Sequence, residues 1–163
     1  MDRLILLRHG KAEADSVSGD DFDRRLAPRG VRESAEMGAQ LADMGFKPDV
    51  ALISTAARTR DTWESAGAAF PGAEARFDDQ LYHADSGTIR RAAEAAGASC
   101  GTVMVVGHNP GMQELTVRLL MEGSAPSGLV AKAQRNFPTA AAAVFLFDAN
   151  GRPHFDGLFY PER

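Results

Sequence analysis

Four short apolar runs recur along the chain and predict buried strands. They occupy residues 3–7, 50–53, 103–106 and 143–147, and they consist mostly of β-branched and aliphatic side chains without polar alternation. Continuous runs of this length are typical of strands that are covered on both faces. A fifth, weaker strand is expected near residues 75–78.

The segments between these runs carry apolar side chains at helical spacing. Stripes with steps of three or four residues run through residues 29–44, 56–70, 89–96 and 112–120, and each ends at a glycine or at Pro-Gly. The alternation of strand and helix predicts an α/β fold. A mainly parallel sheet would lie between two layers of helices, which is a three-layer α/β/α sandwich.

The last part of the chain departs from this alternation. Residues 140–148 and 153–158 both resemble strands, and the Asn150-Gly151 pair between them is a strong hairpin signal. We therefore expect an antiparallel edge on the sheet. Residues 123–139 contain two prolines and two glycines, and this composition predicts a loop that partly covers a site.

Composition and charge narrow the class of protein. A chain of 163 residues is long enough for one sizeable core and short for two domains. Its net charge of −4 argues against a general nucleic-acid-binding surface. Cys100 is the only cysteine, and the apolar run before Arg8 is too short for a signal peptide. We expect a cytoplasmic protein that binds neither nucleic acid nor a membrane.

Arginine and histidine side chains follow three of the predicted strands. Ligands of open α/β sheets collect beyond the carboxyl ends of the strands, where the loops converge. Two arginines and two histidines would meet there: Arg8, His9, Arg58 and His108.

The helices that follow these strands would add their own positive ends. Asn109 is a good N-cap and Pro110 suits the first helical position, so His108 would stand just before a helix N-terminus. Ser54 could cap the next helix in the same way, with Arg58 about one turn further on. The unpaired N–H groups at these helix starts favour a bound anion.

These residue types suit phosphoryl transfer. Guanidinium groups match the oxygens of a phosphoryl group, one imidazole can attack phosphorus, and the other can donate a hydrogen bond. Neighbouring arginines disfavour the imidazolium form, and Gly10 would give the backbone room to approach the phosphate. A zinc site is the other use of two histidines, but the chain lacks a His-x-x-x-His or His-x-His pair and the arginines would repel a cation.

Three motifs occur in order along the chain. They are Arg8-His9-Gly10, the S-x-x-x-R-x-x-x-T spacing of Ser54, Arg58 and Thr62, and Gly107-His108-Asn109-Pro110. In combination they resemble the histidine phosphatase superfamily, whose fold is phosphoglycerate-mutase-like. Residues 23–26 before Arg29-Gly30, residues 81–84 and residues 106–111 are similar to the SixA-like phosphohistidine phosphatases within it.

The resemblance implies a role for each converging side chain. His9 would be the nucleophile and would form a phosphohistidine intermediate that water hydrolyses, while Arg8, Arg58 and His108 would hold the phosphoryl group. Arg24 would line the entrance, although an arginine follows it where the family has proline. One histidine phosphatase domain would span residues 1–163, with no cofactor and no metal ion.

One departure from the family concerns the general acid. Many members carry a glutamate shortly after the third strand, whereas residues 78–85 contain none. His83 and Asp85 are the local candidates for this role. Asp79 is a third, although it is more simply interpreted as a solvated loop charge.

The missing glutamate affects which phosphorylated group the protein could hydrolyse. An alkoxide leaving group needs a proton in the transition state, whereas the imidazole of phosphohistidine leaves readily once its ring is protonated. A weak acid and a short chain therefore favour phosphohistidine on a protein surface, and the expected partner is a phosphohistidine-bearing protein. A small-molecule phosphomonoesterase or mutase stays open as an alternative, as does a phosphate-binding module without turnover.

Overall fold

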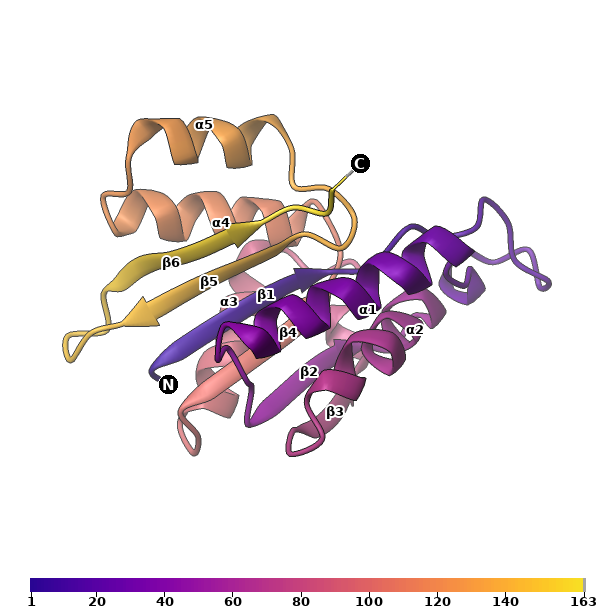
Figure 1. The fold of residues 1–163 in the computed structure, drawn as a ribbon, viewed down its shortest axis with the longest axis horizontal. Coiled ribbons are helices and arrows are strands. Elements are labelled where there is room, and N and C mark those ends of the chain that lie inside the picture. Colours follow the sequence, from indigo (N-terminus) through magenta and orange to yellow (C-terminus); the bar gives the residue numbers. More distant parts are fainter. Residues whose placement is uncertain (163) are drawn as a thin grey trace.

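Six strands form one mixed sheet in the computed structural model, which describes residues 1–162 (Figure 1). The strands are β1 (Arg3–Arg8), β2 (Val50–Ser54), β3 (Glu74–Asp78), β4 (Thr102–Gly107), β5 (Ala142–Phe147) and β6 (Pro153–Phe159). Their order is β3-β2-β4-β1-β5-β6, and the first four are parallel to one another. β5 runs antiparallel to β1 and to β6. The predicted mainly parallel sheet with an antiparallel edge is confirmed.

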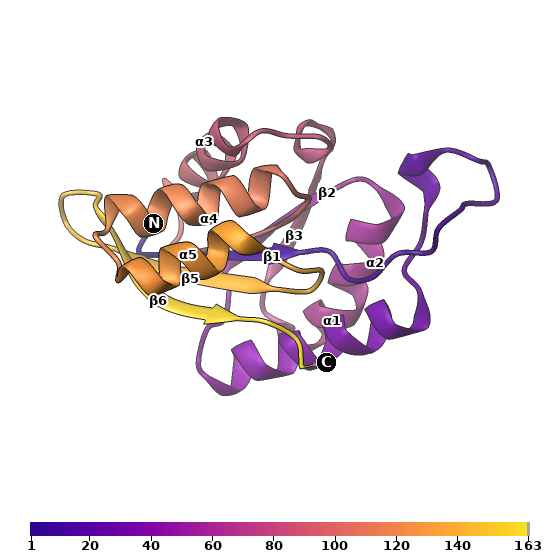
Figure 2. The ribbon, with the colours of Figure 1, turned by 90° about the horizontal axis from the view of Figure 1, so that it is seen from above.

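Five α-helices cover the two faces of this sheet (Figure 2). They are α1 (Pro28–Asp43), α2 (Ala57–Ala66), α3 (Ser86–Gly97), α4 (Gly111–Glu122) and α5 (Ser127–Arg135). α1 and α2 lie on one side, and α3 and α4 lie on the other with α5 packed against α4. Among the described residues, none of these helices is both long and apolar enough to cross a membrane.

The central strands are buried on both faces, which explains why their sequences do not alternate. In β1, Leu4 and Leu6 pack with the α3 and α4 side of the core. Ile5 and Leu7 pack with the α1 and α2 side. Since successive side chains of a strand point to opposite faces, four consecutive apolar residues are needed to fill both layers. This burial holds the end of β1 in a fixed position.

The turn between β5 and β6 is the hairpin that Asn150-Gly151 predicts. Gly151 has a φ of 76°, and its N–H donates to the Asp148 carbonyl oxygen. The Asp148 carboxylate accepts from the backbone N–H groups of Asn150 and Arg152. A glycine is favoured here because other residues rarely adopt this backbone conformation.

The prediction of a loop over residues 123–139 is wrong, because this segment contains α5. Its inner face is apolar, with Leu129 and Val130 half-buried and Ala133 fully buried. The Gln113 side chain of α4 donates to the Ala133 carbonyl oxygen at 2.8 Å. The prolines and glycines at both ends of the segment obscure a helical stripe that is only two turns long.

The connection between β1 and α1 projects at the carboxyl end of the sheet. It is the long loop at the right of Figures 1 and 2, and it contains a short 3₁₀ turn, Asp21–Asp23. An isolated bridge between Ala12 and Leu26 closes its base. The loop therefore reaches over the edge where the strand ends meet.

Candidate active site

The register of the sheet brings the two histidines together. Arg8 of β1 pairs with Gly107 of β4, so His9 and His108 follow paired positions on adjacent parallel strands. The His9 N–H donates to the Gly107 carbonyl oxygen at 3.1 Å. The centroids of the two rings are 5.3 Å apart.

His9 is held as a neutral imidazole with a defined tautomer. Its Nδ1 lies 2.7 Å from the Gly10 carbonyl oxygen, which can only accept, so Nδ1 carries the proton and Nε2 has the lone pair. The side chain is buried, and desolvation lowers the pKa of His9 to about 3, with further lowering by the charges of Arg8, Arg58 and Arg24. At neutral pH, Nε2 is therefore free to act as a nucleophile.

His108 lies beside His9, and only one of its two ring nitrogens has a hydrogen-bond partner among the described residues. Its Nε2 lies 2.7 Å from Ser54 Oγ, and Nδ1 is buried with no hydrogen-bond partner in the described part of the chain. Desolvation is also the main cause that lowers the pKa of His108 to about 3. If the Ser54 hydroxyl donates to Nε2, the proton is on Nδ1, which can then donate to a phosphoryl oxygen.

Ser54 therefore has a different role from the predicted one. α2 begins at Ala57, and the Ser54 Oγ lies 3.5 Å from the Ala56 N–H, at the limit of a hydrogen bond. Its short contact is with His108 instead. The expectation that Ser54 caps the helix is wrong, because α2 starts later than predicted and Ala56 occupies the cap position.

Asn109 and Pro110 also differ from the prediction. α4 begins at Gly111, so Pro110 precedes the first helical residue. The Asn109 Oδ1 accepts from the Gln113 N–H at 3.2 Å, and its Nδ2 donates to the Phe137 carbonyl oxygen at 2.9 Å. Asn109 thus links the start of α4 to the segment after α5.

The predicted arginines do converge on this site. Arg8 donates to the Phe137 carbonyl oxygen at 3.0 Å. Arg58 is buried in the first turn of α2, and its Nε has no hydrogen-bond partner among the described residues. Arg24 lies further out, where its Nη1 donates to the Glu13 carbonyl oxygen at 2.8 Å. One buried and two half-buried guanidinium groups beside two neutral imidazoles form a place for an anion.

Asp21 contacts both Arg58 and Arg24, and the sequence analysis did not identify it as a site residue. Arg58 donates to the Asp21 carbonyl oxygen at 2.9 Å and to its carboxylate at 3.0 Å. Arg24 and the Tyr82 hydroxyl donate to the same carboxylate, at 3.0 and 2.6 Å. The Tyr82 ring packs edge-on against His108. In the sequence, only the acidic residues next to Arg24 could have indicated that a carboxylate contacts these arginines.

Gly10 is required for packing, and both of its polar groups are used within the protein. Its N–H donates to Thr62 Oγ1, and its carbonyl accepts from His9. A Cβ at this position would lie 2.6 Å from Ser34 Oγ and 2.7 Å from the Gly30 carbonyl oxygen of α1. The expected room beside Gly10 is therefore filled by α1, and the Gly10 carbonyl orients the His9 ring.

The three candidates for the general acid lie in different settings. Asp85 caps α3, and the Thr88 N–H that donates to it at 2.8 Å lowers the pKa of this carboxyl, which keeps it anionic. Asp79 accepts from the Thr55 hydroxyl at 2.6 Å, so it is not a free solvated charge. His83 is exposed and has a φ of 59°, and the centroid of its ring lies 3.9 Å from that of the tilted Tyr82 ring. Of the three, His83 alone is not held as a hydrogen-bond acceptor.

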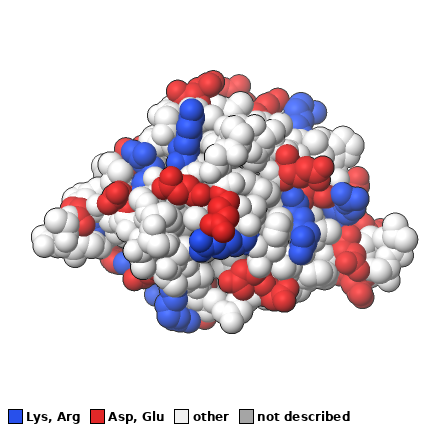
Figure 3. Space-filling model, turned by 90° about the horizontal axis from the view of Figure 1, so that it is seen from below, with Lys and Arg blue, Asp and Glu red and all other residues white. Residues whose placement is uncertain are grey.

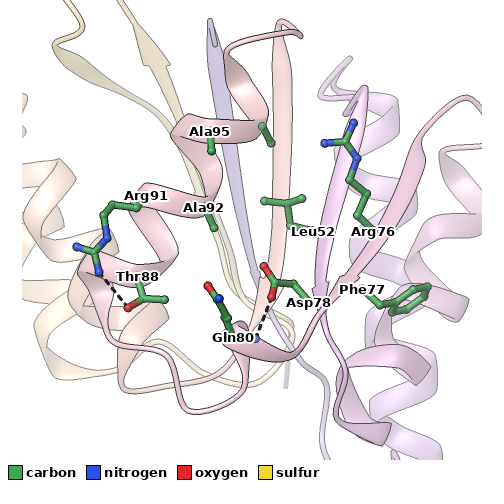
Figure 4. Close-up of a pocket in the computed structure, with 10 residues that line it drawn as sticks. Leu52, Arg76, Phe77, Asp78, Gln80, Thr88, Arg91, Ala92 and Ala95 are labelled. Atoms are coloured by element: carbon green, nitrogen blue, oxygen red, sulfur yellow. Dashed lines mark hydrogen bonds between the residues drawn. The ribbon is translucent and has the colours of Figure 1, made fainter.

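A cavity with an open mouth lies elsewhere, between β3 and α3 (Figure 4). It has a volume of about 640 Å³ and is lined by Arg76, Asp78, Thr88 and Arg91 among others. Asp78 accepts from the Gln80 N–H, and Arg91 donates to Thr88. His9 and His108 do not line this cavity, so its size does not identify the reactive site.

Within residues 1–162, no three histidine, cysteine, aspartate or glutamate side chains are grouped closely enough to hold a metal ion. On the face of the molecule shown in Figure 3, acidic and basic side chains are interspersed, so neither sign of charge forms a continuous patch there.

Histidines and arginines that converge at the carboxyl edge of an α/β sheet are suited to bind a phosphoryl group, and comparison with known proteins identifies the family. Residues 4–99 match the model of the histidine phosphatase superfamily, branch 1. The chain belongs to this superfamily. The match contains His9 and Arg58, whereas His108 lies beyond it.

Solved structures narrow the comparison. A protein from Agrobacterium tumefaciens assigned as the phosphohistidine phosphatase SixA is 34% identical, with a TM-score of 0.86 over 98% of each chain. A second protein so assigned, from Nakamurella multipartitia, is 31% identical, with a TM-score of 0.83 over 99% of this chain and 97% of that one. An uncharacterized protein from Mycobacterium tuberculosis is 34% identical over 85% of each chain. The chain is thus a SixA-like member of the superfamily.

Proposed function

We propose that this protein hydrolyses phosphohistidine on other proteins through a covalent phosphohistidine intermediate on His9, without a metal ion. The observation that carries the proposal is the His9 ring itself. Its Nδ1 is held by the Gly10 carbonyl, and its neutral Nε2 stands among Arg8, Arg58 and His108. A module that only bound phosphate would need none of this preparation of a nucleophile.

In the first step, the lone pair of His9 Nε2 forms a bond to phosphorus. The bond between phosphorus and the substrate's imidazole nitrogen breaks, and its electron pair returns to that ring. The substrate ring already carries a proton on its other nitrogen, so it leaves as neutral imidazole. Arg8, Arg58 and His108 Nδ1–H stabilise the charge on the phosphoryl oxygens.

In the second step, water attacks the phosphorus of phosphorylated His9. The phosphorus–nitrogen bond breaks, and its electron pair returns to Nε2. The ring becomes neutral again because Nδ1 has kept its proton, and hydrogen phosphate leaves with release of one proton to solvent. The Gly10 carbonyl stabilises the positive charge of the phosphorylated ring between these steps.

The surroundings of the site support phosphohistidine as the substrate. Asp79 and Asp85 are both occupied as hydrogen-bond acceptors, so neither is a good proton donor for an alkoxide. A protonated imidazole needs no such donor. We propose a cytoplasmic setting with a phosphohistidine-bearing protein as partner, and Arg24 at the entrance.

The proposal is tested with one peptide that carries phosphohistidine or, in a second preparation, phosphoserine at the same position. The wild-type protein should release phosphate mainly from the phosphohistidine peptide, and rapid quenching at alkaline pH should trap phosphorylated protein. His9→Ala should abolish both signals. His154→Ala is the matched control, because His154 is exposed on β6 and pairs with Asp148.

Two results would count against the proposal. Turnover by His9→Ala equal to that of the wild type would reject His9 as the nucleophile. A higher kcat/KM for small phosphate esters than for phosphohistidine would favour a phosphomonoesterase instead.

A further inference from the structure

The Asp21 carboxylate is the acidic group that the protein places directly on its phosphate-binding arginines. Its Oδ1 accepts from Arg24 at 3.0 Å, and its Oδ2 accepts from Arg58 at 3.0 Å and from Tyr82 at 2.6 Å. The side chain is 48% exposed. It belongs to the loop between β1 and α1, at the right of Figure 3, where acidic side chains are visible. A negative charge beside an anion site weakens the binding of any phosphate and therefore needs an explanation.

Asp21 occupies only one edge of the Arg58 guanidinium. It accepts from Nη1 through its carbonyl oxygen and from Nη2 through its carboxylate. The Nε–H of the buried Arg58 has no partner in the described chain, and together with the second N–H of Nη2 it forms a fork that suits two phosphoryl oxygens. Arg58 can thus hold the phosphoryl group while Asp21 stays in place.

The position of Asp21 corresponds to the leaving-group side. His9 lies on the buried floor of the site, with 7% of its surface exposed. In an in-line displacement, the leaving group is opposite the nucleophile, and therefore on the open side. Asp21, Tyr82 and His83 form this open rim, since Tyr82 contacts Asp21 and packs against both His83 and His108.

We propose that Asp21 is a specificity determinant that favours a phosphoryl group on a protonated imidazole over one on an anionic leaving group. This inference rests on the proposed function and names the feature that selects its substrate. The leaving ring is cationic before the phosphorus–nitrogen bond breaks and neutral afterwards, so the transition state retains part of the positive charge. A carboxylate at the rim attracts this charge and repels the carboxylate of a phosphorylated acid.

The charge of Asp21 is maintained by its surroundings. The Tyr82 hydroxyl and the nearby Arg58 and Arg24 hold the pKa of this carboxyl well below its usual range. It therefore stays anionic throughout the working pH range. Tyr82 and the two arginines in turn keep the carboxylate at the rim.

The test is Asp21→Asn, which keeps an oxygen acceptor for Arg58 and removes the charge. At an effective dielectric between those of protein and water, loss of one charge at the rim should lower kcat/KM for the phosphohistidine peptide about 3- to 10-fold. Most of this loss should be in KM. For 3-phosphoglycerate, an anionic ester, kcat/KM should rise by a similar factor. Asp21→Glu, which retains the charge, should retain most of the preference.

The control is Asp20→Asn, which removes the same charge from the neighbouring exposed residue. This variant should change the ratio of the two specificity constants by less than twofold. An equal fall for both substrates in Asp21→Asn would show that Asp21 only holds Arg58 and would overturn the inference. If the wild type hydrolyses the phosphohistidine peptide but Asp21→Asn leaves the ratio unchanged, the inference alone fails. A wild type that does not hydrolyse this peptide rejects the proposed function as well.

Discussion

Thr62 links Gly10, which follows the proposed nucleophile His9, to Arg58, and Thr62→Val should separate the effect of this link from that of packing. Its hydroxyl is fully buried, accepts from the Gly10 N–H at 3.0 Å and donates to the Arg58 carbonyl oxygen at 2.7 Å. Valine has the same shape but cannot accept a hydrogen bond. The substitution therefore leaves the buried Gly10 N–H without its partner.

The expected loss of stability follows from this single donor. An unsatisfied buried N–H costs about 1–3 kcal/mol, whereas the Arg58 carbonyl keeps a helical hydrogen bond and loses little. Thr116→Val is the matched control, because Thr116 is equally buried and its hydroxyl donates only to the Met112 carbonyl one turn earlier. That change should cost less than about 1 kcal/mol.

The assay is urea unfolding of both variants, followed by circular dichroism, together with turnover of the phosphohistidine peptide in the absence of urea. Thr62→Val should also lower kcat, because Gly10 is the residue whose carbonyl orients the His9 ring. Thr116→Val should keep the wild-type rate. A Thr62→Val protein that is as stable and as active as Thr116→Val would refute the view that this hydrogen bond positions the nucleophile.

Three further predictions concern the arginines, the titration of the histidines and Ser54. Arg58→Ala should lower kcat/KM about 10²- to 10³-fold, as the loss of a hydrogen-bond donor to the transition state does. Arg24→Ala should lower it far less. Equal losses would contradict the assignment of Arg24 to the entrance. Since the pKa of His9 and of His108 falls from 6.5 to about 3 on folding, the unfolded chain binds more protons below pH 6.5. Stability should be complete above pH 6.5 and decrease as the pH falls, by about 2 kcal/mol for each ring at pH 5. Urea unfolding at pH 7 and pH 5 should show a smaller decrease for His9→Asn, and an unchanged decrease would rule out a neutral buried His9. Ser54→Ala should lower kcat, because it removes the partner of His108 Nε2. Ser34→Ala, which removes a buried hydroxyl that has no hydrogen-bond partner among residues 1–162, should not lower it. Similar rates for the two variants would show that Ser54 does not orient His108.

The convergence of the arginines and histidines could be predicted because it depends on only two features. The apolar runs locate the strands, and the carboxyl ends of parallel strands meet at one edge of the sheet. Arg8 therefore pairs with Gly107 in the structure, and the residues that follow them become neighbours. No knowledge of side-chain conformations is needed for this step.

Two interpretations rested on local sequence alone. Ser54 was assigned as a helix cap, and Asp85 was one of the candidates for a general acid. In the structure, Ser54 bonds His108, which is 54 residues away, while Asp85 is itself the cap of α3. Hydroxyl and carboxylate groups take the best partner within reach, and distant partners are not visible in a local pattern.

Local patterns describe the buried floor of the site, where His9 lies, better than its open rim, which Asp21, Tyr82 and His83 form. The floor is made of strand ends and the first turn of α2, and its motifs predicted that Arg8, His9, Arg58 and His108 lie together. The rim is made of a loop and of residues after β3, and Asp21 reaches Arg58 across 37 positions without any periodic signal. In the proposed mechanism the leaving group meets the rim, so the choice of substrate would depend on the residues that sequence motifs describe least. Asp21 is therefore the residue of this chain at which that choice should be measured first.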